Sequence, residues 1–321
     1  MSAKLIYGNR TYERTTLTGR YAVARLLKTY AVAAACVLSF VTAPAVSIAQ
    51  ALPLPESVLQ QVQAVESRLG ARVGVALVDV ASARHWAWRG HERFPLNSTF
   101  KAFACAALLA RVDAAGSSLA RTTTISKADI VSYSPVFESQ IGHSVTLAQL
   151  CEAAVTMSDN AAANLILKHI DGPEGFTRFM RSLGDDASRL DRFEPELNEA
   201  TPGDLRDTTT PAAIVHAVLR LVEGDALTVA SKARLVRWMR DNRVAGPVLR
   251  AVLPEGWQIA DRTGAGGYGS RSIVAVVWPS DGTPWGIAIY LTQSRADMAE
   301  RNRAIGDIGR AAFDFIRSDA R

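Results

Sequence analysis

Segments that favour β-strands occur near both ends of the chain and are rare in its middle. They are short runs of apolar and β-branched residues, the composition typical of buried strands. The expected strands cover residues 72–80, 85–89, 258–263, 271–278 and 285–292. A single sheet containing all five must therefore be assembled from both ends of the chain.

Helical patterns account for most of the remaining sequence. Amphipathic helices are expected at 57–69 and 295–317, and helical patterns dominate 98–240 outside a loop around 192–211. With 321 residues, 48% of them hydrophobic, the chain is long enough to bury a large core. The sequence predicts an α/β sheet domain, formed by residues 52–96 together with 241–321. Residues 97–240 are expected to form an all-α domain inserted into it.

The net charge of +5 comes from the first residues of the chain. Residues 1–51 contain six Lys or Arg and one acidic residue, which leaves 30 basic and 30 acidic residues in the rest. The body of the protein is therefore neutral, and no basic stripe remains for a nucleic-acid backbone. Nucleic acid is not an expected partner.

The basic head precedes an uncharged stretch rich in Ala and Val, which is the layout of a secretory signal peptide. A membrane anchor is the alternative, but Pro44 and the small residues near the end of the stretch disfavour it. A lipid anchor at Cys36 is disfavoured because Ala33 is a poor match to the leucine that usually precedes it. We expect a signal peptide at 1–51, cleavage after Ala49 or Ala51, and a periplasmic protein without stable membrane association.

Ser98 and Lys101 lie three positions apart at the start of an almost entirely apolar helical segment. Residues at i and i+3 share a helix face, so Lys101 is expected to contact the Ser98 oxygen. A helix cap followed by a solvated lysine is the ordinary interpretation of this spacing. A lysine in a buried helix is costly to desolvate, however, and this favours a catalytic pair.

Two other site types are disfavoured by their sequence context. Residues 264–269 match the glycine pattern of dinucleotide-binding loops, but a strand rather than a helix follows them, so the glycines are expected at a tight strand edge. The five histidines are scattered, and none of them forms a metal-binding pair. We therefore expect no cofactor and no metal.

The loop around 192–211 contains carboxylates that are ordinarily just solvated. An acyl-enzyme also needs a base to activate water, and Glu194 with Asn198 is suited to hold that water.

Once the leader is removed, Cys105 and Cys151 are the only cysteines. Export favours a disulfide between them, and two inert buried thiols are the alternative.

Several ordered motifs together resemble one known family. They are Ser98-Thr99-Phe100-Lys101, Tyr133-Ser134-Pro135, Ser158-Asp159-Asn160, Glu194-Pro195-Glu196-Leu197-Asn198 and Arg262-Thr263-Gly264, with the cysteine pair. The chain resembles a class A β-lactamase over essentially its whole mature length. The resemblance implies an antiparallel five-stranded sheet flanked by helices with a helical insert domain, a monomer, and a small β-lactam substrate.

The resemblance also implies catalytic roles. Ser98 would attack the lactam carbonyl, and its proton would pass to Lys101 or through water to Glu194. The N–H groups of Ser98 and Ala265 would form the oxyanion hole, and Ser158 would protonate the leaving nitrogen. The residues implied in substrate binding are Tyr133, Asn160, Asn198, Arg262, Thr263, Gly264 and Arg271. An ion pair between Arg192 and Asp207 would hold the ends of the Glu194 loop.

Arg262 departs from the more common lysine of this motif. With arginine at this position, the motif resembles that of the carbenicillin-hydrolysing penicillinases. Arginine keeps the positive charge of lysine but does not readily lose a proton. We therefore expect hydrolysis of penicillins, including carboxypenicillins. A penicillin-binding receptor or a D-Ala-D-Ala peptidase is the competing function, which Glu194 and Asn198 disfavour because a receptor has no need to hydrolyse its adduct.

Overall fold

The computed structural model describes residues 51–280 and 282–319. The expected leader lies outside these residues apart from Ala51, so the signal peptide and its cleavage site stay predictions. Within the described part of the chain, no helix combines the length and the apolar character that crossing a membrane requires.

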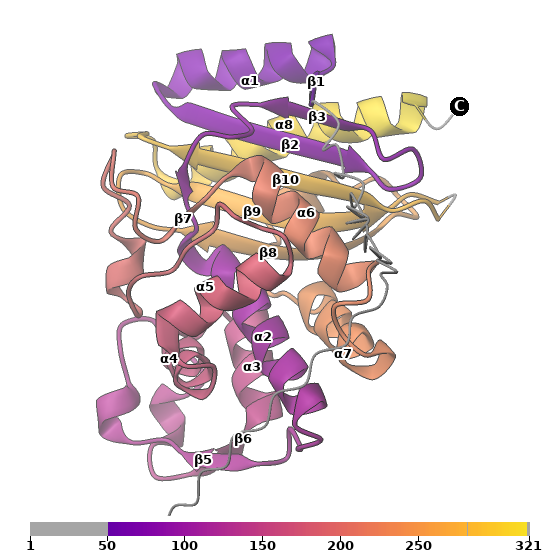
Figure 1. The fold of residues 1–321 in the computed structure, drawn as a ribbon. Coiled ribbons are helices and arrows are strands. Elements are labelled where there is room, and N and C mark those ends of the chain that lie inside the picture. Colours follow the sequence, from indigo (N-terminus) through magenta and orange to yellow (C-terminus); the bar gives the residue numbers. More distant parts are fainter. Residues whose placement is uncertain (1–50, 281, 320–321) are drawn as a thin grey trace, which may run out of the picture. The chain divides into compact units, whose positions relative to one another are not determined.

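A six-stranded sheet contains both ends of the described chain (Figure 1). Its strands, from edge to edge, are β1 (Leu52–Pro53), β3 (His85–Trp88), β2 (Arg72–Asp79), β10 (Trp285–Thr292), β9 (Arg271–Trp278) and β8 (Gln258–Ala265). Neighbours pair antiparallel, except that β1 runs parallel to β3. The five expected strands are confirmed. The additional strand β1 is only two residues long, too short to produce a sequence pattern.

Helices cover both faces of the sheet (Figure 1). On β9, Ile273, Ala275 and Val277 pack toward α1 (Glu56–Leu69) and α8 (Met298–Asp319). The alternate residues Val274 and Val276 join the opposite core, against α6 (Pro211–Val222) and the helical domain. Because successive side chains of a strand point to opposite faces, this continuous apolar strand is buried on both sides.

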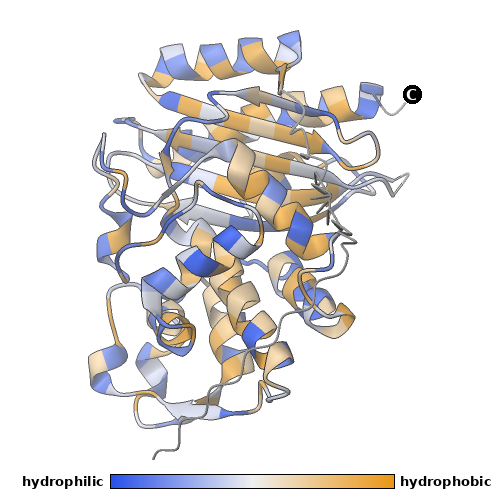
Figure 2. Cartoon of the chain, in the orientation of Figure 1, coloured by the Kyte–Doolittle hydropathy of each residue, from blue (hydrophilic) through white to orange (hydrophobic). Residues whose placement is uncertain are grey.

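The helical domain surrounds one buried helix, α2 (Phe100–Ala114). Figure 2 shows α2 as hydrophobic over most of its length, as expected for a helix buried all round. The helices packed around it are α3 (Leu147–Thr156), α4 (Asn160–His169), α5 (Gly172–Ser182) and α7 (Val229–Arg240). The domain also contains two short ladders, β4 (Phe94–Pro95) with β7 (Thr208–Thr209) and β5 (Thr122–Thr124) with β6 (Ser144–Thr146).

The two cysteines of the described chain lie next to each other in the core. Cys105 on α2 and Cys151 on α3 are both fully buried, and they are free thiols in this structure. Burial raises the pKa of the Cys151 thiol, and its hydrogen bond with Cys105 raises it further. The expected disulfide is therefore not formed in this structure, although its two partners are neighbours. Pairing after export stays a prediction.

Candidate active site

A cleft lies where the helical domain meets β8 and the start of α8. Most of the expected site residues line it, together with four others. The lining residues are Ser98, Tyr133, Ser158, Asn160, Asn198, Val244, Pro247, Thr263, Gly264, Ala265, Arg271, Met298 and Asn302. Three further expected residues, Lys101, Glu194 and Arg262, are buried side chains that contact this lining.

A short helical turn presents Ser98 to the cleft. Residues Asn97–Thr99 form one 3₁₀ turn, which leads directly into α2. The Thr99 hydroxyl donates to the carbonyl of Leu96 at 2.6 Å and lies 2.9 Å from the buried Tyr290 hydroxyl on β10. These bonds fix the turn to the sheet, so Ser98 sits on a rigid support.

Lys101 is fully buried one turn behind Ser98. Its Nζ donates to the Ser158 carbonyl at 2.8 Å, the Ser158 Oγ at 3.3 Å and the Asn160 Oδ1 at 2.5 Å. The Lys101 Nζ also lies 3.1 Å from Glu194 Oε1. The two groups form an ion pair, but their geometry is not that of a hydrogen bond. Within the described chain no hydrogen bond joins Lys101 to the Ser98 hydroxyl. Ser158 and Asn160 accept the hydrogen bonds of the Lys101 ammonium in this structure, and the direct contact with Ser98 stays a prediction.

Burial lowers the pKa of Lys101 to about 8. The Glu194 carboxylate opposes this shift and raises the pKa, whereas the nearby Arg262 guanidinium lowers it. A lysine with this pKa loses its proton far more readily near neutral pH than an exposed lysine does. Lys101 is thereby suited to accept a proton as well as to carry a charge.

Arg262 reaches across the domain boundary to Ser158. Its Nη2 donates to Ser158 Oγ at 2.6 Å, and its Nη1 donates to the Thr263 carbonyl at 2.8 Å. The guanidinium is fully buried, and burial lowers its pKa to about 10, against the opposing charge of Asp261. Asp261 is held in turn by Arg250 Nε and Asn242 Nδ2, each at 2.8 Å.

Asp159 is the structural member of the Ser-Asp-Asn triplet. One of its oxygens accepts from the N–H of Ala162 at 2.9 Å and so caps α4. The other accepts from the N–H groups of Val136 at 2.9 Å and Phe137 at 3.1 Å. This carboxylate thereby fixes the Tyr133 segment to α4, leaving Tyr133 60% exposed at the rim of the cleft.

The loop that carries Glu194 is fixed from two sides. Asn164 on α4 accepts from the Glu194 N–H and donates to the Glu194 carbonyl, both at 2.9 Å. Asn198 Nδ2 donates to Glu194 Oε2. The loop peptide before Pro195 is cis. Sequence reasoning missed Asn164, although a polar residue four positions after Asn160 on an otherwise apolar helix face was a usable signal.

An ion pair at the neck of the Glu194 loop joins its two ends, as expected. Arg192 Nε donates to Asp207 Oδ2 at 2.6 Å. Asp207 Oδ1 also accepts from the N–H groups of Asp191 at 2.7 Å and Arg192 at 3.0 Å. Because Asp207 is 1% exposed, its charge depends on these donors.

On the other side of the cleft, Arg271 completes the cationic wall. Its Nε donates to Asn302 Oδ1 at 2.8 Å and its Nη1 donates to the Gly264 carbonyl at 3.0 Å. Burial lowers the pKa of Arg271 to about 10, and the neighbouring Arg301 lowers it further. No sequence pattern pointed to Asn302, because it lies 31 residues after Arg271 on another element.

The glycines after Thr263 allow the chain to pass close to the Glu194 loop. A Cβ on Gly266 would lie 2.6 Å from the Asn198 carbonyl, and one on Gly267 would lie 2.2 Å from that of Glu199. The Gly267 N–H donates to the Asn198 carbonyl at 2.8 Å. These glycines therefore occupy a tight strand edge, as their sequence context indicated.

Comparisons with known proteins agree with this geometry. Residues 57–316 match the model of the family described as "Beta-lactamase enzyme family". β-Lactamase AER-1 of Aeromonas hydrophila is 52% identical over 259 residues, which cover 80% of this chain and 85% of that protein. The chain belongs to the class A β-lactamase family.

Other class A β-lactamases are similar to nearly the same extent. β-Lactamase CARB-3 of Pseudomonas aeruginosa is 50% identical over 266 residues, covering 83% of this chain and 92% of that protein. The crystal structure of the chromosome-encoded β-lactamase of Vibrio parahaemolyticus aligns with a TM-score of 0.79 and 44% identity, covering 81% and 99% of the two chains. An ancestral class A β-lactamase of Gram-negative bacteria aligns with a TM-score of 0.79 and 46% identity, covering 81% and 99%.

Proposed function

We propose that this class A β-lactamase hydrolyses penicillins, including carboxypenicillins, through an acyl-enzyme on Ser98. The observation that carries the proposal is the contact of Lys101 Nζ with Glu194 Oε1 at 3.1 Å, beneath the turn that presents Ser98. Two proton-accepting groups are thus buried behind a hydroxyl that lines the cleft, which is what acylation and deacylation both require.

In acylation, Ser98 attacks the lactam carbonyl and its proton passes to Lys101 or through water to Glu194. The N–H groups of Ser98 and Ala265 stabilise the oxyanion. Ser158 then protonates the ring nitrogen. Its Oγ accepts from Arg262 and Lys101, and arginine can only donate, so the Ser158 proton is left to point into the cleft.

In deacylation, Glu194 activates a water that Asn198 helps to hold. Asn198 Oδ1 is buried and accepts no hydrogen bond within the described chain, and Glu194 Oε1 likewise has no aligned donor. Buried acceptors without donors are costly, and a water that donates to both satisfies them. A penicillin-binding receptor or a peptidase has no need of this pair, which favours hydrolysis over stable acylation.

Substrate anchoring falls to the cationic side of the cleft. Arg262, Thr263 and Arg271 bind the carboxylate of the fused ring, for which a guanidinium fork is well shaped. Asn160 binds the side-chain amide of the substrate. Its Nδ2 donates to the Ser132 carbonyl at 2.8 Å, which leaves its second N–H for the substrate.

We also propose that the protein works as a periplasmic monomer after its leader is cleaved near Ala49 or Ala51. The basic head and the uncharged stretch after it support export. In that oxidising compartment, the adjacent thiols of Cys105 and Cys151 pair.

The direct test is a hydrolysis assay on purified protein with benzylpenicillin, a carboxypenicillin and an oxyimino-cephalosporin. We expect both penicillins to be hydrolysed and the cephalosporin to be a poor substrate. Ser98→Ala is the matched control, because it removes the hydroxyl without opening a large cavity. Residual turnover close to that of the wild type in this variant would refute the role of Ser98.

A further inference from the structure

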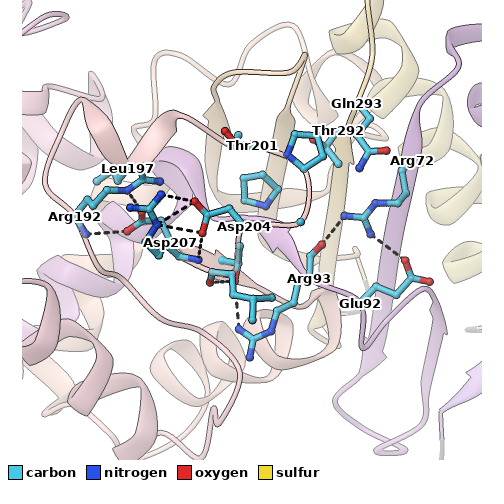
Figure 3. A pocket seen from close by; sticks show the side chains of 17 residues that line it. Arg72, Glu92, Arg93, Arg192, Leu197, Thr201, Asp204, Asp207, Thr292 and Gln293 are labelled. Carbon is cyan, nitrogen blue, oxygen red and sulfur yellow. Dashed lines mark hydrogen bonds and ion pairs between the residues drawn. The ribbon is translucent and has the colours of Figure 1, made fainter.

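Arg93 borders two concave regions at the back of the Glu194 loop. The first is shown in Figure 3 and lies between that loop and the neighbouring ends of strands β2 and β10. Its cations are already neutralised by ion pairs: Arg72 with Glu92 at 2.9 Å, Arg192 with Asp207 at 2.6 Å and Arg206 with Asp204 at 2.7 Å. Apart from Arg93 itself, this first region therefore offers a ligand no arginine without a carboxylate partner.

The second region lies on the other side of Arg93, against α5. Its lining carries four arginines and two carboxylates, a net charge of +2, and shares no residue with the catalytic cleft. The residues are Arg93, Glu174, Thr177, Arg178, Arg181, Arg189, Leu190 and Asp191. We call this region the arginine concavity.

Two guanidiniums of the arginine concavity have no carboxylate partner within the described chain. Arg93 Nη1 donates to the carbonyl of Ala187 and to Thr208 Oγ1 at 3.3 Å. Arg181 Nη1 donates to the carbonyls of Asp185 and of Ser188, the latter at 2.7 Å. Both arginines thus donate hydrogen bonds to carbonyls of the same turn, residues 185–188.

Like charges are brought together by this arrangement. Burial lowers the pKa of Arg93, and the charges of Arg181 and Arg189 lower it further. Asp185 offsets part of this repulsion, but its oxygens already accept from the N–H groups of Ala187 and Ser188 and from the Ser188 hydroxyl. The Nε and Nη2 groups of Arg93 and Arg181 form no hydrogen bond within the described chain, so their donors are available to a ligand.

We propose that the arginine concavity binds a small multivalent oxyanion of the phosphate class. Guanidinium groups bind the oxygens of phosphates and carboxylates through paired N–H donors, and a multivalent anion best neutralises several of them at once. Neutral ligands do not relieve the repulsion between these arginines. The proposal does not depend on the hydrolytic activity, because the concavity and the cleft share no lining residue.

The place of this site gives the ligand a route to the Glu194 loop. Arg189 pairs with Asp191, whose Oδ2 accepts from the Asp207 N–H at 3.0 Å. Arg93 contacts Thr208 just after that loop. A bound oxyanion therefore lies against the neck of the loop that carries the deacylation base.

The test is a calorimetric titration of the purified protein with sodium pyrophosphate, against sodium chloride at the same ionic strength. We expect saturable binding at one site. Arg93→Gln should weaken it by roughly tenfold or more, since a charge-assisted, partly buried contact is lost. Arg310→Gln is the matched control, because Arg310 is an exposed arginine on α8.

Two fold-safe variants test the sign of the charge effect. Arg178 and Glu174 have side chains 61% and 91% exposed, so replacing either with glutamine should leave the fold intact. Arg178→Gln should weaken binding and Glu174→Gln should tighten it, each by about threefold, because each changes one charge close to the ligand. Lost structure cannot tighten binding.

Absence of saturable heat, equal affinity in Arg93→Gln, or looser binding in Glu174→Gln would overturn the proposal. Binding to vesicles of phosphatidylglycerol without binding to free pyrophosphate would overturn it too, since it would identify a membrane surface rather than a small anion as the ligand.

Discussion

Lys101 is the residue whose environment most constrains the chemistry. Its pKa is lowered to about 8 by burial, while the Glu194 carboxylate raises it. Removing that carboxylate must therefore lower the pKa of Lys101 further.

If neutral Lys101 takes the Ser98 proton, the acylation rate rises with pH through the pKa of Lys101. We expect this rise near pH 8 in the wild type and at a lower pH in Glu194→Gln. The measurement is the pre-steady-state acylation rate with benzylpenicillin between pH 5 and pH 9. An unshifted rise would exclude Lys101 as the titrating group, and a profile that becomes flat would assign the base role to Glu194.

Arg262 is the position where the chain departs from the more common motif. Arg262→Lys keeps a charge but loses the fork that reaches both Ser158 and the Thr263 carbonyl, at a cost on the order of 1 to 2 kcal/mol. We expect activity to survive, with a larger loss for a carboxypenicillin, which carries a second carboxylate. The measurement is kcat/KM for that substrate and for benzylpenicillin. An equal fall for both would mean that Arg262 binds the shared ring carboxylate without setting selectivity.

At the scale of single residues, the sequence identified the site but not all of its contacts. Motif residues such as Ser98 and Asn160 meet in the cleft as expected. Helical spacing did not predict that Lys101 also contacts Ser158 and Asn160, because it places side chains on a helix face without showing what lies opposite. Asn164 carried a usable signal that the sequence analysis missed, whereas Asn302 belongs to a helix brought in by tertiary packing, which one sequence does not show.

Among the elements, the Glu194 loop is held by polar contacts at its two ends and to α4. Asp207→Asn removes the charge that Arg192 Nε and two backbone N–H groups approach. We expect it to slow penicillin turnover by roughly tenfold, about 1.4 kcal/mol, while the melting temperature falls only slightly. The measurements are kcat and a thermal melt of the same preparation.

The matched control is Asp204→Asn in the same loop, whose pair with Arg206 is half-exposed. A surface pair of this kind contributes roughly 0 to 1 kcal/mol, so this variant should turn over penicillin like the wild type. Unchanged turnover in Asp207→Asn would mean that the buried pair does not hold the loop in its active conformation.

Element boundaries were predictable where composition changes sharply. Strands β9 and β10 begin and end at the expected residues because apolar runs are bounded there by Gly, Ser and Pro. The helix at the end of the chain begins three residues later than expected, at Met298. The short strands β1, β4 and β7 form because they pair with neighbouring segments, not because of their own composition. No sequence pattern therefore predicted them.

For the whole molecule, export should add one covalent link to the fold. Cys105 and Cys151 are neighbouring, fully buried thiols on two packed helices. Closing a loop of this length stabilises a fold by up to about 4 kcal/mol in the chain-entropy model. We expect protein purified from the periplasm and unfolded without reductant to show no free thiol in a colorimetric titration. Two reactive thiols per chain would contradict the pairing.

We propose that Ser98 forms an acyl-enzyme and that Glu194 activates the water that hydrolyses this intermediate. Intact-mass spectrometry tests it most directly, on Glu194→Gln mixed with benzylpenicillin and sampled over time. We expect a persistent adduct with the mass of one whole penicillin, mapped to Ser98, and clearance at least about 100-fold slower than in the wild type. The same adduct should be missing from Ser98→Ala. An adduct that clears from Glu194→Gln at the wild-type rate would exclude Glu194 as the deacylation base.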